Sequence, residues 1–144
     1  MSTETPRSLA LLIARVGLGV IFVAHGWQKF DTNGLDATKA GFAGMGVPAP
    51  ELAAYFSTFV ELVGGAALIL GLLTPVVAFL LFLDMLGAFF IVHVDKGVFA
   101  ADGGYELVVA LGVGALLLAV FGAGRFSADA ILKLPGARAT AAAR

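Results

Sequence analysis

Four apolar stretches, each about long enough to cross a bilayer as a helix, dominate this sequence of 144 residues. They cover residues 9–28, 52–73, 76–94 and 105–121. A spanning helix needs about 20 apolar residues, whereas a membrane strand needs about half as many and alternates apolar with polar side chains. The stretches therefore predict an all-α membrane protein, built as an antiparallel bundle of four transmembrane helices.

The composition supports a lipid environment. Hydrophobic residues make up 60% of the chain and charged residues 13%, against about half and about a quarter in an average soluble domain. A chain of this size cannot bury so many apolar side chains in its own core, so we expect a multi-pass protein of the cell (inner) membrane. The net charge of −1 argues against nucleic-acid binding, and the absence of cysteine excludes disulfides and thiolate metal sites.

The connections predict one domain with a tail. We expect a single four-helix domain over residues 1–130 and a basic, Ala-rich cytoplasmic tail over residues 131–144. The second and third stretches meet at Thr74-Pro75, which predicts a tight turn with Thr74 as the N-cap of the third helix. In the longer first connection, we expect a short helix over residues 37–44.

The distribution of Lys and Arg predicts an orientation. With four spans, both termini lie on the same side as the turn between the second and third spans. That side carries Arg7, Arg125, Lys133, Arg138 and Arg144, and the other side carries Lys29, Lys39 and Lys96. Cytoplasmic segments are richer in Lys and Arg, so we predict that both termini are cytoplasmic.

Three ionisable residues lie inside the predicted spans: Arg15, Glu61 and Asp84. A charge at that depth costs a few kcal/mol, so such residues usually face inward and pair. We expect a midplane polar core in which Arg15 pairs with Glu61 or Asp84, because a guanidinium binds a carboxylate through two hydrogen bonds. The core could set the helix register, or it could carry protons or bind a ligand. Arg15 could instead extend to the nearby interface.

A second polar group is predicted near the outer membrane face. It contains His25, Lys29, His93 and Glu106, with Asp95 beside them. The histidines could transfer protons, while Lys29 could anchor the interface and Glu106 could stabilise a helix N-terminus. Two histidines without ligand spacing do not indicate a metal site, and we expect none.

Several motifs, in order along the chain, resemble those of DoxX-type membrane proteins. They are ARVGLG (14–19), HGWQKF (25–30), Pro48, ELVGG (61–65), LGLLT (70–74), His93, Glu106 and GAGRFSAD (122–129). The resemblance implies a four-helix integral membrane protein associated with redox systems. Relatives include a DoxD-like subunit of thiosulfate:quinone oxidoreductase and a membrane partner of a superoxide dismutase and a sulfurtransferase. Arg15 and Glu61 belong to the motifs, whereas Asp84 does not.

Three functions follow from these features. The first is a non-catalytic membrane subunit or scaffold of a redox or oxidative-stress assembly, with lipid, a second copy or other subunits as partners. The second is a membrane redox subunit that binds quinone, its buried charges and outer histidines transferring protons; any enzymatic role would then be that of a quinone-linked oxidoreductase subunit. The third is a small transporter or channel, which is disfavoured because broken helices and internal repeats are absent.

Overall fold

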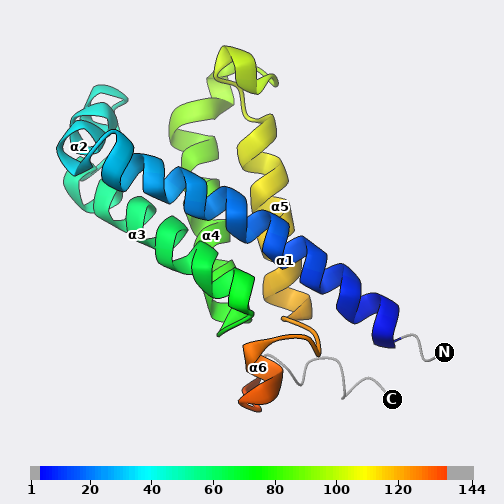
Figure 1. Cartoon of the computed structure of the whole chain (residues 1–144). Coiled ribbons are helices and arrows are strands. Elements are labelled where there is room, and N and C mark those ends of the chain that lie inside the picture. Colours follow the sequence, from blue (N-terminus) through cyan, green and yellow to red (C-terminus); the bar gives the residue numbers. More distant parts are fainter. Residues whose placement is uncertain (1–3, 136–144) are drawn as a thin grey trace.

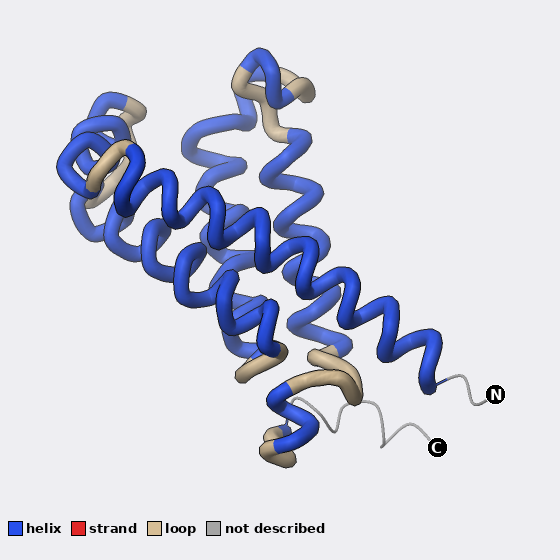
Figure 2. Tube along the Cα trace, in the orientation of Figure 1, coloured by secondary structure: helices blue, strands red, loops and turns tan. Residues whose placement is uncertain are grey.

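A computed structural model describes residues 4–135 of the chain (Figure 1). All regular structure in this part of the chain is helical, as Figure 2 shows. The predicted all-α class is therefore confirmed for these residues. The predicted tail over residues 131–144 lies mostly outside the described part.

Four long helices correspond to the four apolar stretches. They are α1 (Glu4–Trp27), α3 (Pro50–Leu70), α4 (Thr74–Ala88) and α5 (Glu106–Phe121). Among the described residues, the helical segments long and apolar enough to cross a bilayer are Thr5–Thr32, Pro50–Leu70 and Thr74–Lys96. α5 is also apolar but has 16 residues, which extend about 24 Å. That is somewhat less than the hydrocarbon core of about 30 Å.

Two of the long helices continue into π-helical turns. α1 leads into η1 (Gln28–Thr32), and α4 leads into η2 (Phe89–His93). Short helices complete the same end of the molecule: α2 (Leu35–Gly44), η3 (Val94–Lys96) and η4 (Ala100–Asp102). The helix expected over residues 37–44 is thus present as α2. π-helical turns inside helices often occur at functional sites, and both turns contribute to the cavity described below.

The long helices pack as two pairs. α1 lies along α3 and α4 lies along α5, while contacts of α3 with α4 and of α1 with α5 join the pairs. Figure 1 shows the pairs close together near the middle of the molecule and separate at the upper end, where α2 and the η3–η4 connection stand apart. This separation creates room between the pairs at that end.

Glycines allow α1 and α3 to approach closely. A Cβ atom added to Gly19 would lie 2.7 Å from the carbonyl oxygen of Gly65, and one added to Gly65 would lie 2.8 Å from the carbonyl oxygen of Gly19. Helices in lipid associate largely through such small residues, because no hydrophobic effect drives them together. The two glycines therefore explain why α1 follows α3.

A small apolar core lies where the two pairs meet. Its buried members are Phe22, Leu68, Ala78, Leu81, Met85, Leu111, Ala115 and Leu118. Many other large apolar side chains on all four helices are exposed. Soluble monomers rarely expose so much contiguous apolar surface, and lipid would cover it here.

The C-terminal segment folds back under the α3–α4 turn. Asp129, at the start of α6 (Ala128–Ile131), is fully buried. Its carboxylate accepts hydrogen bonds from the backbone N–H groups of Leu73 at 2.7 Å and Thr74 at 2.9 Å. The predicted N-cap role of Thr74 is wrong, because its buried hydroxyl has no hydrogen-bond partner. The carboxylate of Asp129 instead accepts the hydrogen bonds of the backbone N–H groups at the start of α4.

Candidate functional site: a polar cavity between the helix pairs

A cavity of about 410 Å³ lies between the helix pairs at the end where they separate. All four long helices contribute to its wall, together with η1, η2 and the segments around α2 and η4. Its ionisable lining residues are His25, Lys29, Glu61, Asp84, His93 and Lys96. Ligand pockets in proteins usually measure about 300–1,000 Å³, so this cavity is large enough for a small molecule.

An ion pair joins the two helices of the first pair inside this cavity. Lys29, on the π-helical turn after α1, donates a hydrogen bond to Glu61 of α3. The Glu61 side chain is 4% exposed, and that of Lys29 is 20% exposed. The ammonium therefore neutralises a buried carboxylate and keeps donors available toward the cavity, because it carries three N–H groups.

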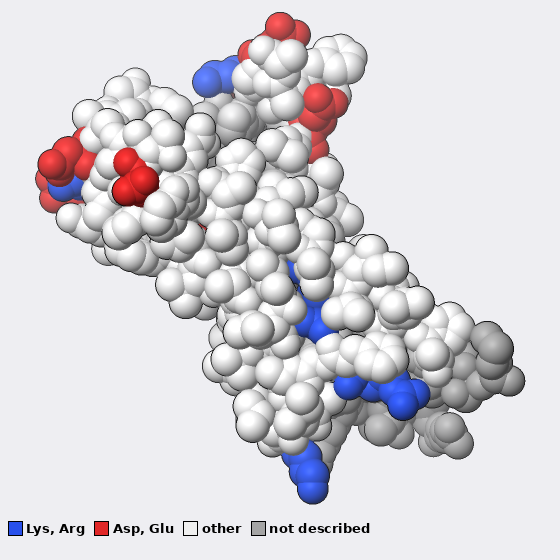
Figure 3. Space-filling view, viewed as in Figure 1, with Lys and Arg blue, Asp and Glu red and all other residues white. Residues whose placement is uncertain are grey.

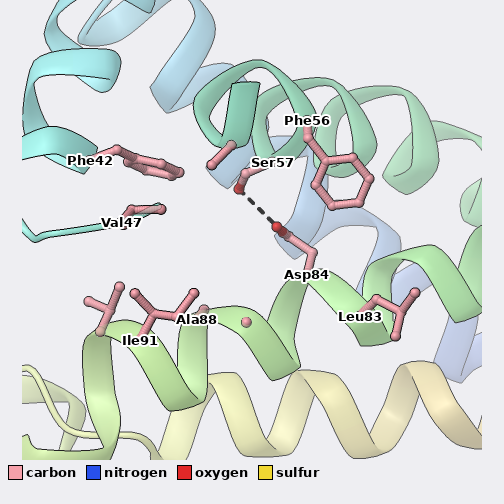
Figure 4. Close-up of a pocket in the computed structure, with 11 residues that line it drawn as sticks. Phe42, Val47, Phe56, Ser57, Leu83, Asp84, Ala88 and Ile91 are labelled. Carbon is pink, nitrogen blue, oxygen red and sulfur yellow. Dashed lines mark hydrogen bonds between the residues drawn. The ribbon is translucent and has the colours of Figure 1, made fainter. Parts of the chain in front are cut away.

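Asp84 lies on the facing helix α4. Its carboxylate accepts a hydrogen bond of 3.3 Å from the hydroxyl of Ser57 on α3, and Figure 4 shows this bond crossing between the two helices. Ser57 and Glu61 lie one turn apart on α3, so both project toward the cavity. The cavity thus contains two carboxylates, those of Asp84 and Glu61. Lys29 forms an ion pair with Glu61.

The two histidines line the cavity from the ends of different helices, His25 from the last turn of α1 and His93 from the turn after α4. His93, on the π-helical turn after α4, forms a hydrogen bond of 2.6 Å between its Nδ1 and the carbonyl oxygen of Gly103. That contact requires a proton on Nδ1, which leaves Nε2 of a neutral ring as an acceptor. His25 of α1 is partly buried and lines the same cavity.

The structure separates Arg15 from the carboxylates. Its Nη1 donates to the carbonyl oxygens of Leu68 at 3.2 Å and Ile69 at 2.6 Å, and its Nη2 donates to that of Phe126. Among the described residues, no ion pair includes Arg15. The expected pairing of Arg15 with Glu61 or Asp84 is wrong, and so is the single midplane core.

The position of Arg15 along α3 explains this result. Glu61 precedes Leu68 by seven residues, or about 10 Å along the helix axis. α1 therefore brings Arg15 to the C-terminal end of α3, where unpaired carbonyls and the negative end of the helix dipole attract a cation. Gly71 leaves room for it, since a Cβ there would lie 2.7 Å from Nη1 of Arg15.

Glu106 does not line the cavity, although it was expected beside the histidines. Its carboxylate accepts a hydrogen bond of 2.8 Å from the backbone N–H of Ala100 and so holds the η4 connection against α5. Asp95 is exposed on η3. Of the predicted outer group, the structure thus brings His25, Lys29 and His93 together with Glu61 and Asp84.

The cavity can form hydrogen bonds with a small molecule. It combines carboxylates, an ammonium group and imidazoles with apolar side chains such as Leu107 and Leu111. Within residues 4–135, no group of three or more His, Cys, Asp or Glu side chains could hold a metal ion. The lining therefore presents hydrogen-bonding groups beside an apolar surface.

Two residues important to this arrangement were missed at the level of sequence. Ser57 was not singled out, and Asp129 appeared only as part of a motif. The four-residue spacing of Ser57 from Glu61 was the available signal for the first. No local signal indicated that Asp129 would cap a helix more than fifty positions earlier.

Comparisons with known proteins identify the family of the chain. The DoxX family model matches residues 10–94. A Bacillus subtilis protein named "Putative oxidoreductase CatD" is 32% identical over 103 residues, covering 72% of this chain and 73% of that protein. The inner membrane protein YphA of Escherichia coli is 31% identical over 128 residues, covering 85% of this chain and 90% of that protein. No solved structure matches significantly. The chain therefore belongs to the DoxX family of membrane proteins.

Proposed function

We propose that this protein is a membrane subunit of a redox assembly and that its cavity binds the head of a quinone. The observation that carries the proposal is the cavity itself, in which Lys29, Glu61, Asp84, His25 and His93 surround about 410 Å³. Groups buried in a membrane protein at this cost are usually functional. The name of the Bacillus subtilis relative, which includes the word oxidoreductase, points in the same direction.

A quinone supplies a carbonyl head that takes up electrons and protons on reduction. Lys29 is suited to donate a hydrogen bond to such an oxygen, since Glu61 occupies only part of its donor capacity. Asp84 and the two histidines line the same cavity and offer a carboxylate and two imidazoles as further hydrogen-bonding groups to the quinone oxygens. The apolar lining would pack against the ring.

The electrons would come from another component of the assembly. The chain contains no cysteine, so it has no thiol redox pair and no thiolate ligands for an iron–sulfur cluster. A subunit that binds the quinone and moves protons, while a partner supplies electrons, combines the two leading functions predicted from the sequence.

Quinone binding by the purified protein tests the proposal. Wild type should retain quinone through purification in mild detergent, as measured by solvent extraction and chromatography, and should bind added quinone. Asp84→Asn and Glu61→Gln should each weaken binding about tenfold, equal to about 1.4 kcal/mol and comparable to one charge-assisted hydrogen bond. Asp95→Asn is the matched control, because it makes the same change at an exposed site.

Two outcomes would contradict this function. The wild-type protein could bind no quinone at all, or the cavity variants could bind as tightly as Asp95→Asn. Partner proteins that copurify in the first case would instead support a scaffold function without a ligand site.

We also propose that α5 is a fourth span, so that residues 1–130 form one domain with both termini in the cytoplasm. α5 packs along α4, which supports a crossing beside it despite its shorter length. Figure 3 shows acidic side chains, each time with a basic group nearby, at the ends that carry α2 and η4, and further basic side chains toward α6. This asymmetry matches the excess of Lys and Arg on cytoplasmic segments.

A further inference from the structure

A second hollow, of about 170 Å³, opens on the side of the molecule between α2, α3 and α4. Its rim includes Phe56, Leu83 and Ile91, which are 43%, 40% and 45% exposed. Figure 4 shows these apolar side chains around the hollow, with Phe42 and Val47 from the α2 segment on the facing side. Exposed apolar side chains of this kind are what a membrane protein presents to lipid.

The side hollow adjoins the main cavity. Five residues line both: Phe42, Ser57, Asp84, Ala88 and Val92. The hydrogen bond between Ser57 and Asp84 crosses from α3 to α4 at this shared boundary (Figure 4). The two spaces are therefore neighbours with one polar contact between the helices that divide them.

We propose that the ligand is amphipathic and enters the cavity from the bilayer through the side hollow. Its polar head would reach Lys29 and Glu61, and its apolar tail would lie between α2, α3 and α4. This inference rests on the proposed function and specifies the ligand class: a molecule with a long apolar chain attached to a hydrogen-bonding head.

The physical properties of the boundary favour this route. At 3.3 Å, the bond between Ser57 and Asp84 lies beyond the usual range for hydroxyl donors, so separating the two groups costs little. Ala88, which also lies at the boundary, presents little bulk there. A tail that enters through the side hollow stays among apolar atoms. Entry through the end of the cavity that carries Lys96 would instead bring the tail into contact with this charged side chain and the backbone of Gly104.

Gly87 and Gly17 provide a matched pair of variants. A Cβ added to either glycine meets no atom within 4 Å, so both positions have open space. Gly87 lies on α4 and lines the side hollow, whereas Gly17 is exposed on α1 and lines neither the hollow nor the cavity. Gly87→Phe would fill the hollow, and Gly17→Phe makes the same change on a surface away from it.

The experiment compares two ligands with the same head. Decylubiquinone and the same benzoquinone head without its chain are titrated into wild type, Gly87→Phe and Gly17→Phe at one detergent concentration. We expect wild type and Gly17→Phe to bind decylubiquinone more tightly than the bare head. We expect Gly87→Phe to weaken decylubiquinone binding about tenfold and to leave the affinity for the bare head unchanged.

The outcomes separate this inference from the proposed function. If Gly87→Phe leaves the affinity for decylubiquinone unchanged, or lowers both affinities equally, the side route is wrong while the cavity remains a quinone site. If wild type binds the bare head as tightly as decylubiquinone, the assignment of an amphipathic ligand is wrong. If wild type binds neither molecule, both proposals are wrong.

Discussion

At the scale of single residues, the ion pair of Lys29 with Glu61 joins the π-helical turn after α1 to α3, in addition to the hydrogen bonds that Arg15 donates to α3. Either charge alone would be costly, because Glu61 is almost completely buried and Lys29 is mostly so. The attraction between them offsets this desolvation only while both are present. The pair can thus stabilise the packing of the helices and still offer Lys29 donors to the cavity.

A double-mutant cycle tests this account. Lys29→Met should lower the free energy of unfolding by about 3 kcal/mol, because it leaves the Glu61 carboxylate buried without a partner. Combining it with Glu61→Gln should restore part of that loss, since the unpaired charge is then removed. Thermal unfolding in detergent measures both effects. Strictly additive losses in the double variant would show that the two side chains do not interact.

Arg15 shows where residue-level prediction failed. Its burial and its inward face were predicted correctly from its place in an apolar stretch, and it is 2% exposed. The partners of Arg15 were not predicted correctly. Backbone carbonyls at a helix C-terminus compete with carboxylates for a guanidinium, and no sequence pattern identifies them as its partners. By contrast, the prediction that Glu61 faces inward agrees with its position, since its side chain is 4% exposed.

At the scale of elements, helix positions followed from local composition. α1, α3, α4 and α5 begin and end within a few residues of the predicted stretches, apart from the earlier start of α1 and the turns that extend α1 and α4. The π-helical turns were not predicted, because they depend on how the helix ends pack against α2 and the η3–η4 connection. The acceptor that caps α4 came from a segment distant in the chain.

The contact between α1 and α3 leads to a prediction about glycine. Gly65→Ala should lower stability by about 1–3 kcal/mol, because the added methyl group meets backbone atoms of α1 that cannot move aside easily. Gly17→Ala is the control on the same helix pair, and its open position should leave stability unchanged or slightly higher. Unfolding midpoints in the same detergent compare them. Equal effects at the two sites would argue against close packing at Gly65.

At the scale of the whole molecule, the two helix pairs meet near the middle and separate toward one end (Figure 1). Their separation forms the cavity, and the back-folded C-terminal segment closes the opposite end through Asp129. The polar residues therefore divide into two groups: a structural one around Arg15 and Asp129, and a cavity group around Glu61 and Asp84.

The proposed orientation can be tested because the chain lacks cysteine. Single cysteines at Asp102, between α4 and α5, and at Lys133, after α5, are exposed reporters. In intact bacterial cells, an impermeant maleimide should label Asp102→Cys, and it should label Lys133→Cys only after lysis. The reverse pattern would invert the orientation, and labelling of both from the same side would show that α5 does not cross the membrane.

The sequence by itself determined the helical class, the membrane environment and the positions of the long helices, because each depends on apolar residues close together in the chain. It also identified nearly all the ionisable residues that line the cavity. Only the tertiary structure decided which of them meet. The close approach of α1 to α3, the separation of the two pairs and the fold-back at Asp129 place residues far apart in the chain side by side, and no local pattern encodes those distances.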